Sequence, residues 1–175
     1  FLRAIVEFDG GDVDKIRQVT IGFNAVSRLL TQRVDAAPAF WNAEGVAVRE
    51  RGLDVREFRI ERYGAPVYPE VVLITSRATL RAKRAQIRDA LRLIQRGVEA
   101  THANPDEAVA RIAKAAGTPD RRLVRIQLDA ILPVLSGRLE LDRAKLEEWA
   151  DFDARIGLVT QRPNVEEAFD FTLAG

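Results

Sequence analysis

The chain has 175 residues, of which 47% are hydrophobic and 30% charged, a composition typical of a folded globular protein. It has no cysteine and one histidine, His102, which excludes a disulfide scaffold, a cysteine nucleophile and a thiolate or multi-histidine metal site. Its 27 basic and 26 acidic residues give a net charge of +1, so the composition predicts no general affinity for nucleic acid. We therefore expect no metal and no cofactor.

The first 76 residues alternate short helix-like and strand-like segments. Residues 2–6 and 26–30 are helix-like, and Asn42 is expected to cap a further helix that Gly52 ends. The strand-like segments are β-branched or apolar, and they are residues 18–22, 34–40, 55–60 and 71–75. Residues 34–40 are expected to be buried. Residues 71–75 read Val-Val-Leu-Ile-Thr, and this unbroken run predicts a strand covered on both faces.

From residue 77 onward the pattern is helical. Apolar residues at helical spacing run from Ile87 to Val98, and Asn104 with Pro105 predicts a new helix that ends at Gly117. Further helices are predicted to begin near Asp120 and Asp142, followed by a terminal turn within residues 166–173. Strand–helix alternation followed by helices favours an α/β fold.

The segment from Val34 to Gly45 is the strongest candidate for ligand binding. Trp41, Asn42 and Glu44 follow small residues that permit close backbone approach. An indole face stacks on planar rings, and a carboxylate accepts hydrogen bonds from the edge of an aminopyrimidine. A structural alternative stays open, in which Trp41 is a core residue and Asn42 only caps a helix.

Both tyrosines of the chain, Tyr63 and Tyr68, lie in a segment that contains one glycine and two prolines. Such a segment is typical of a rigid hinge, and the tyrosines would suit an amphipathic pocket. The alternative is a stiff loop with surface aromatic residues.

An arginine recurs every fourth residue from Arg84 to Arg96, which predicts a basic stripe on one helix. It could meet an acidic partner, a phosphate backbone or an anionic membrane surface, although most solvated helix faces look similar. The chain has no glycine-rich nucleotide loop, nucleophile elbow or zinc-protease motif, so we expect no catalytic residues and no enzyme.

Several runs together resemble one family: Asp35-Ala36-Ala37, Trp41-Asn42-Ala43-Glu44-Gly45, Tyr63-Gly64 and Tyr68-Pro69-Glu70-Val71-Val72-Leu73. They are similar to solute-binding proteins of bacterial ABC importers related to the eukaryotic thiamine-pyrimidine synthesis proteins. Members bind pyrimidine precursors, and relatives bind riboflavin-type, sulfonate or nitrate solutes. The resemblance runs from Gly10 to Asp170.

The resemblance implies a type II periplasmic-binding-protein fold of two lobes, of which this chain would be the C-terminal portion, helical in its second half. Residues 1–64 would belong to the second lobe, residues 65–76 to a hinge segment and strand, and residues 77–175 to the returning part of the first lobe. A missing N-terminal segment, or a second copy of the chain, would then complete the fold.

The resemblance also implies a function. Trp41, Asn42 and Glu44 would form one wall of a ligand cleft, with Phe23 and Asn24 near its mouth and Tyr63 or Tyr68 at the hinge. The ligand would be a small aminopyrimidine-like nutrient, and the partner an ABC permease rather than nucleic acid. The protein would be periplasmic or extracellular, with a lipid anchor as one option in the full-length precursor.

Two alternative functions are a pyrimidine-synthase-like enzyme and a ligand sensor. The eukaryotic relatives are pyrimidine synthases that use a histidine and a cysteine-rich motif, which a chain without cysteine does not provide. A ligand-sensing domain of a transcriptional regulator would use the same two-lobe fold, and a DNA-binding segment elsewhere in the gene would favour it.

Overall fold

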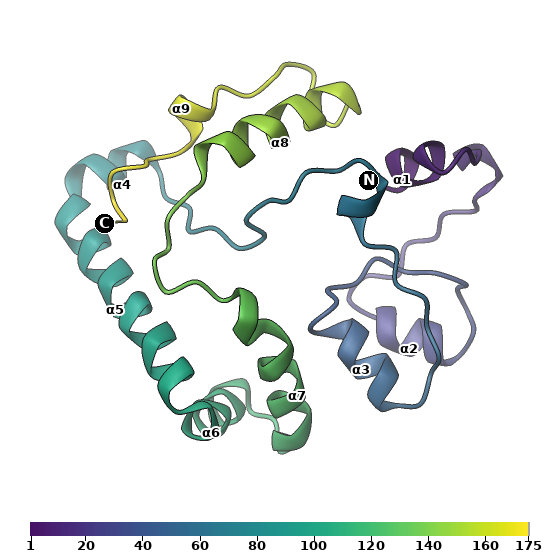
Figure 1. Ribbon diagram of the computed structural model, residues 1–175, viewed down its shortest axis with the longest axis horizontal. Helices are drawn as coiled ribbons and strands as arrows, with labels where there is room; N and C mark the ends of the chain where they lie inside the picture. The colour runs from purple at the N-terminus through teal and green to yellow at the C-terminus, as the bar shows by residue number, and fades with distance from the viewer. Residues whose placement is uncertain (175) are drawn as a thin grey trace. The chain divides into compact units, whose positions relative to one another are not determined.

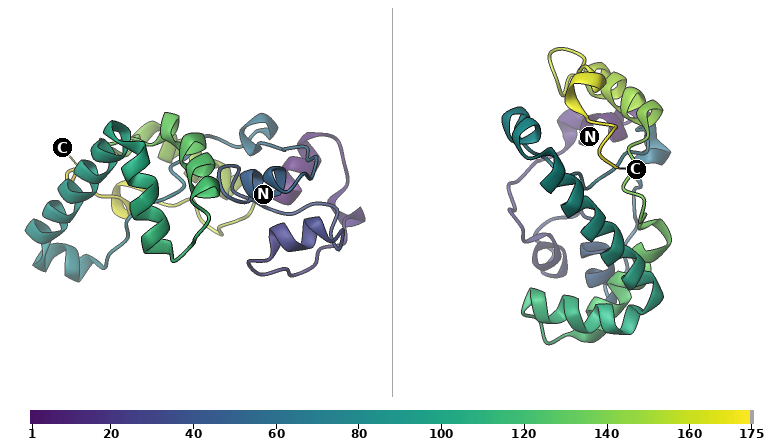
Figure 2. Two further views of the ribbon diagram at one scale, coloured as in Figure 1. Left: turned by 90° about the horizontal axis from the view of Figure 1, so that it is seen from below. Right: turned by 90° about the vertical axis from the view of Figure 1, so that its left-hand side faces the viewer.

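The computed structural model describes residues 1–174 (Figures 1 and 2), and the regular structure of these residues is helical. The α-helices are α1 (Leu2–Phe8), α2 (Ala25–Leu30), α3 (Glu44–Glu50), α4 (Arg77–Ala82), α5 (Arg84–Ala103), α6 (Pro105–Ala116), α7 (Arg121–Ile131), α8 (Arg143–Arg155) and α9 (Val165–Ala168). Single turns of 3-10 helix occur at Val13–Lys15, Ile60–Tyr63 and Leu132–Val134.

Helices α6, α7 and α8 begin where the sequence predicts, and α6 also ends where predicted, whereas the terminal turn predicted within residues 166–173 is found as α9 at Val165–Ala168. The Asn104 side chain accepts a hydrogen bond of 3.1 Å from the backbone N–H of Glu107, which begins α6. Gly117 ends α6 in the left-handed conformation with φ 63°. Asp120 caps α7 and Asp142 caps α8 in the same way as Asn104. Local capping chemistry therefore determines these boundaries.

The segments predicted as strands form no strand within residues 1–174. A strand requires a neighbouring segment that pairs with its backbone N–H and C=O groups, and residues 71–75 have no such ladder here. Val71 and Ile74 are 88% and 89% exposed, so the prediction that this segment is covered on both faces is wrong for this structure. Residues 34–40, predicted as a buried strand, are mostly exposed. The α/β class is therefore not confirmed.

The chain divides into two compact units. The first unit contains Phe1–Arg17, Phe58–Gln95 and the residues from Arg138 onward. The second unit contains Gln18–Glu57 and Arg96–Gly137. The predicted boundaries at residues 64 and 76 follow the lobes of the resembled family, and they stay a prediction.

The core of the second unit lies between α6 and α7, which are in contact and lie next to each other at one end of Figure 1. Its buried residues are Ala108, Val109, Ala113, Val124 and Leu128. Helix α3 buries Val46, Ala47 and Val48 and contacts both α2 and α7. The short helix that follows the candidate ligand segment is thus anchored by its apolar face.

In the first unit, α8 packs against α9 through Leu146, Ala150 and Val165. The segment after α9 is held by Arg84, whose guanidinium donates to both carboxylate oxygens of Asp170 at 2.7 and 3.2 Å. Two-pronged pairing of this kind fixes orientation as well as distance.

Candidate functional site

The candidate ligand segment is a tight turn that leads into α3. The carboxylate Oε2 of Glu44 accepts a hydrogen bond of 3.0 Å from the backbone N–H of Phe40. The Phe40 carbonyl in turn accepts from the N–H groups of Ala43 and Gly45, each at 3.0 Å. Ala43 occupies the cap position, so the prediction that Asn42 caps this helix is wrong, because the Glu44 side chain reaches back over the turn instead.

Trp41, Asn42 and Glu44 are all half-buried in this turn. The arrangement offers an indole face, a carboxamide and a carboxylate within four residues. Although Oε2 of Glu44 is occupied by Phe40, a carboxylate has a second oxygen with its own lone pairs, so Glu44 can still accept a hydrogen bond from a ligand. The Glu44 side chain can therefore stabilise the start of α3 and bind a ligand at the same time.

Two side chains that sequence reasoning missed hold the turn through its carbonyl groups. Arg49, which also pairs with Glu57, donates to the Trp41 carbonyl at 3.5 Å. Gln127 on α7 donates to the Ala43 carbonyl at 3.3 Å. No sequence signal points to Arg49. Gln127 carries one, because it is a polar residue on the apolar face of a helix.

Phe23 and Asn24 lie in the same unit, directly before α2. The Phe23 side chain is fully exposed, and the Asn24 amide donates to the Ile21 carbonyl at 3.2 Å. Helix α2 contacts α3, so these residues and the Trp41–Glu44 segment belong to neighbouring elements of one unit.

Tyr63 and Tyr68 belong to the first unit, where both rings pack against other aromatic residues. Tyr63 lies at 6.1 Å between ring centres from Phe8 and from Phe58. Tyr68 stacks on Trp149 at 4.0 Å, and burial raises the pKa of the Tyr68 hydroxyl above its usual value. The structure thus divides the predicted ligand residues, five in one unit and these two in the other.

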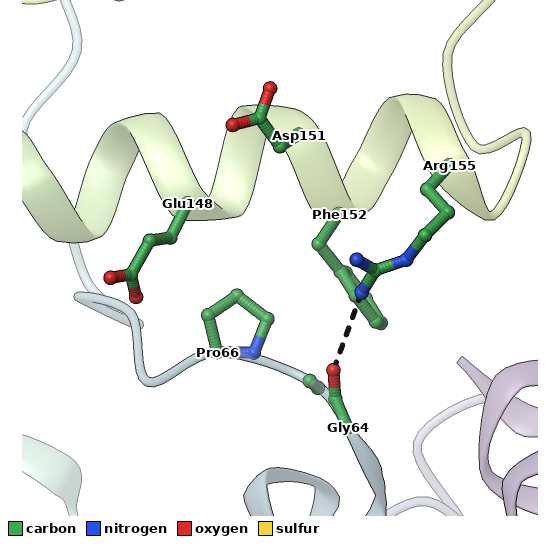
Figure 3. A pocket seen from close by; sticks show the side chains of 7 residues that line it. Gly64, Pro66, Glu148, Asp151, Phe152 and Arg155 are labelled. Atoms are coloured by element: carbon green, nitrogen blue, oxygen red, sulfur yellow. Dashed lines mark hydrogen bonds between the residues drawn. The ribbon is translucent and has the colours of Figure 1, made fainter.

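An open hollow of about 370 Å³ lies in the first unit, between the segment after Tyr63 and helix α8 (Figure 3). Arg155 reaches across it and donates to the Gly64 carbonyl at 3.5 Å. The lining residues are Gly64, Ala65, Pro66, Glu148, Asp151, Phe152 and Arg155. None of the predicted ligand residues lines it, so the hollow is distinct from the candidate site.

The predicted basic stripe is partly neutralised within the chain. Arg84 pairs with Asp170, and Arg92 pairs with Asp89 at 3.2 Å.

His102 contacts the Leu135 carbonyl through Nε2 at 2.9 Å. Within the described part of the chain, acidic and histidine side chains form no group of three that could hold a metal ion.

Comparison with known proteins places the turn and its neighbours in a family. The sequence profile described as "NMT1/THI5 like" matches residues 1–108, which is more than half of the chain. The chain therefore belongs to the NMT1/THI5-like family, whose fold is of the type II periplasmic-binding kind. The profile match ends earlier than the resemblance seen in the sequence, which runs to Asp170.

The chain is also similar to a curated binding protein. The chain is 30% identical over 109 residues to the formylaminopyrimidine-binding protein of Halalkalibacterium halodurans. The aligned part is 62% of this chain and 33% of the relative, so the chain spans about a third of the relative's length. No solved structure matches the chain significantly. The comparisons support the predicted thiamine-pyrimidine-precursor family, and the relative is a binding protein, in agreement with the expectation that this chain is not an enzyme.

Among the described residues, no helix combines the length and the apolar character that crossing a bilayer requires.

Proposed function

We propose that the protein is the substrate-binding component of an ABC importer and captures a thiamine pyrimidine precursor. The similarity to a formylaminopyrimidine-binding protein carries this proposal. The candidate segment supports it, because Trp41, Asn42 and Glu44 lie within the residues that the family profile matches.

The side chains of this segment favour an aminopyrimidine over a sulfonate or nitrate. An indole face stacks on a flat heteroaromatic ring, and a carboxylate accepts from amino groups. A buried anion would instead require cationic or N–H donors, and the Glu44 carboxylate would repel it. Phe23, Asn24, Tyr63 and Tyr68 stay proposed contributors at the edge of the site.

In this proposal the ligand lies in a cleft between the two lobes of the family fold, and the closed form is recognised by a permease. The protein would then act in the periplasm or outside the cell. Fractionation of cells that express the full gene product tests the location, and co-purification of a permease in the presence of ligand tests the partner.

Isothermal titration of the full gene product with formylaminopyrimidine tests the ligand. We expect saturable binding with one ligand per protein, and no competition from riboflavin or a small aliphatic sulfonate. Binding of riboflavin or the sulfonate without binding of any aminopyrimidine would overturn the proposal.

A further inference from the structure

Gln127 is a polar residue on the apolar face of α7. Its neighbours at helical spacing on that face are Val124, which belongs to the core of the second unit, and Ile131, which packs against that core. The Gln127 side chain is half-buried, where an amide is stabilised by a partner within the protein. It finds one 84 residues earlier in the chain, at the carbonyl of Ala43.

Ala43 lies inside the candidate ligand segment, between Asn42 and Glu44. Its carbonyl accepts two hydrogen bonds, one of 2.9 Å from the N–H of Ala47 within α3 and one of 3.3 Å from Gln127. These bonds fix the plane of the peptide that joins Ala43 to Glu44. The orientation of this peptide sets the direction in which the Glu44 side chain leaves the turn.

A second contact joins α7 to the far end of α3. Arg122 pairs with Glu50 at 2.5 Å, and Glu50 is the last residue of α3. Since Gln127 contacts the start of α3 and Arg122 its end, the two helices run antiparallel. The Arg122 contact is remote from the ligand segment, and it provides an internal control.

We infer that Gln127 is a positioning residue for the ligand segment, holding the peptide that joins Ala43 to Glu44 in the orientation that binding requires. The inference rests on the proposed function. It also assigns a role to residues beyond the family profile, which ends at residue 108. Residues after 108, which the family profile does not match, would thus set the geometry of a ligand segment that the profile does match.

The test uses Gln127→Met, which keeps the side-chain length and removes the donor, and Gln127→Lys, which keeps an N–H donor. We expect Gln127→Met to weaken formylaminopyrimidine binding about fivefold, the factor for one lost hydrogen bond. Gln127→Lys should recover most of the affinity, and the control Arg122→Ala should stay within about twofold of the wild type. Equal losses in Gln127→Met and Arg122→Ala, or no loss in Gln127→Met, would overturn the inference.

A second readout does not depend on the ligand. Within the 175 residues, a Trp149→Phe background leaves Trp41 as the remaining tryptophan, and its quenching by acrylamide in a protein of this length reports the exposure of the turn. Gln127→Met should increase quenching in the free protein, whereas Gln127→Lys and Arg122→Ala should not. If the wild type binds no aminopyrimidine, the proposed function fails, and unchanged quenching in Gln127→Met would separately refute the positioning role.

Discussion

The carboxylate of Glu44 accepts a hydrogen bond of 3.0 Å from the backbone N–H of Phe40, four residues earlier. The proposed ligand-binding carboxylate is therefore also the group that closes the turn before α3. A substitution at residue 44 changes two properties at once unless it is chosen to separate them.

Glu44→Gln separates them, because a glutamine side chain keeps an acceptor for the Phe40 N–H but loses the charge. We predict that Glu44→Gln weakens binding of an aminopyrimidine by about 1–3 kcal/mol, the range for a hydrogen bond to a charged group. Titration calorimetry on the full gene product measures the change. Glu44→Ala should in addition lower the melting temperature, since it removes the acceptor at the start of α3. Unchanged affinity in Glu44→Gln would remove Glu44 from the binding site.

Gly64 adopts φ 79°, and a Cβ atom there would lie 3.0 Å from Cδ2 of Phe8. Gly52 adopts φ 77° and has open space around it. We predict that Gly52→Ala lowers the free energy of unfolding by about 1 kcal/mol through backbone strain alone. Gly64→Ala should lower it by about 2 kcal/mol, because the phenyl ring must also move. Urea unfolding of both variants measures the difference. Equal losses of unfolding free energy would show that the Phe8 ring moves aside without destabilising the protein.

The pair between Arg84 and Asp170 predicts a pH dependence of stability. Hydrogen bonds from the Arg84 guanidinium, its largest influence, hold the pKa of Asp170 well below the usual range. The stabilisation is therefore fully present above the ordinary pKa of about 4 and disappears as the pH falls through the lower native value.

Asp170→Asn should lower the melting temperature by about 2 °C at neutral pH, and the gap to the wild type should close in strong acid. Scanning calorimetry at several pH values measures the gap. The control is Asp89→Asn, which removes an exposed pair with Arg92 and should change little. A gap that persists in strong acid would mean that the charge on Asp170 is not the cause.

The stacked pair of Tyr68 and Trp149 predicts a spectroscopic change. The ring centres are 4.0 Å apart with the planes 22° from parallel. Tyr68→Leu should cost about 1 kcal/mol of unfolding free energy and reduce the near-ultraviolet circular dichroism of Trp149. In the wild type, Tyr68 should ionise above the usual tyrosine range, because burial raises its pKa. An unchanged dichroism spectrum in Tyr68→Leu would contradict the stack.

The helices were predictable because their signals are local. Asn104, Gly117, Asp120 and Asp142 act on the backbone within a few residues, so the sequence alone locates both ends of α6 and the starts of α7 and α8. Strands depend on partners that are distant in the chain, and an apolar run such as residues 71–75 carries no information about whether a partner is present. The strand predictions failed in this structure for that reason.

The candidate site divides in the same way. The chemical character of Trp41, Asn42 and Glu44 is visible in the sequence, and so is a turn followed by a helix. The contacts of Arg49 and Gln127 with the turn depend on how α3 folds back and how α7 packs. For the contact of Gln127 the sequence carries one signal, which is a polar residue on the apolar face of α7. For the contact of Arg49 it carries none.

The exposure of Val71 and Ile74 has a consequence for handling the protein. An uncharged, β-branched run with open backbone groups is a template for intermolecular pairing, and it matches the composition of segments that initiate aggregation. We therefore expect this chain to aggregate increasingly as its concentration is raised. A gatekeeper charge such as Val71→Lys should raise its solubility limit without altering the helical circular dichroism.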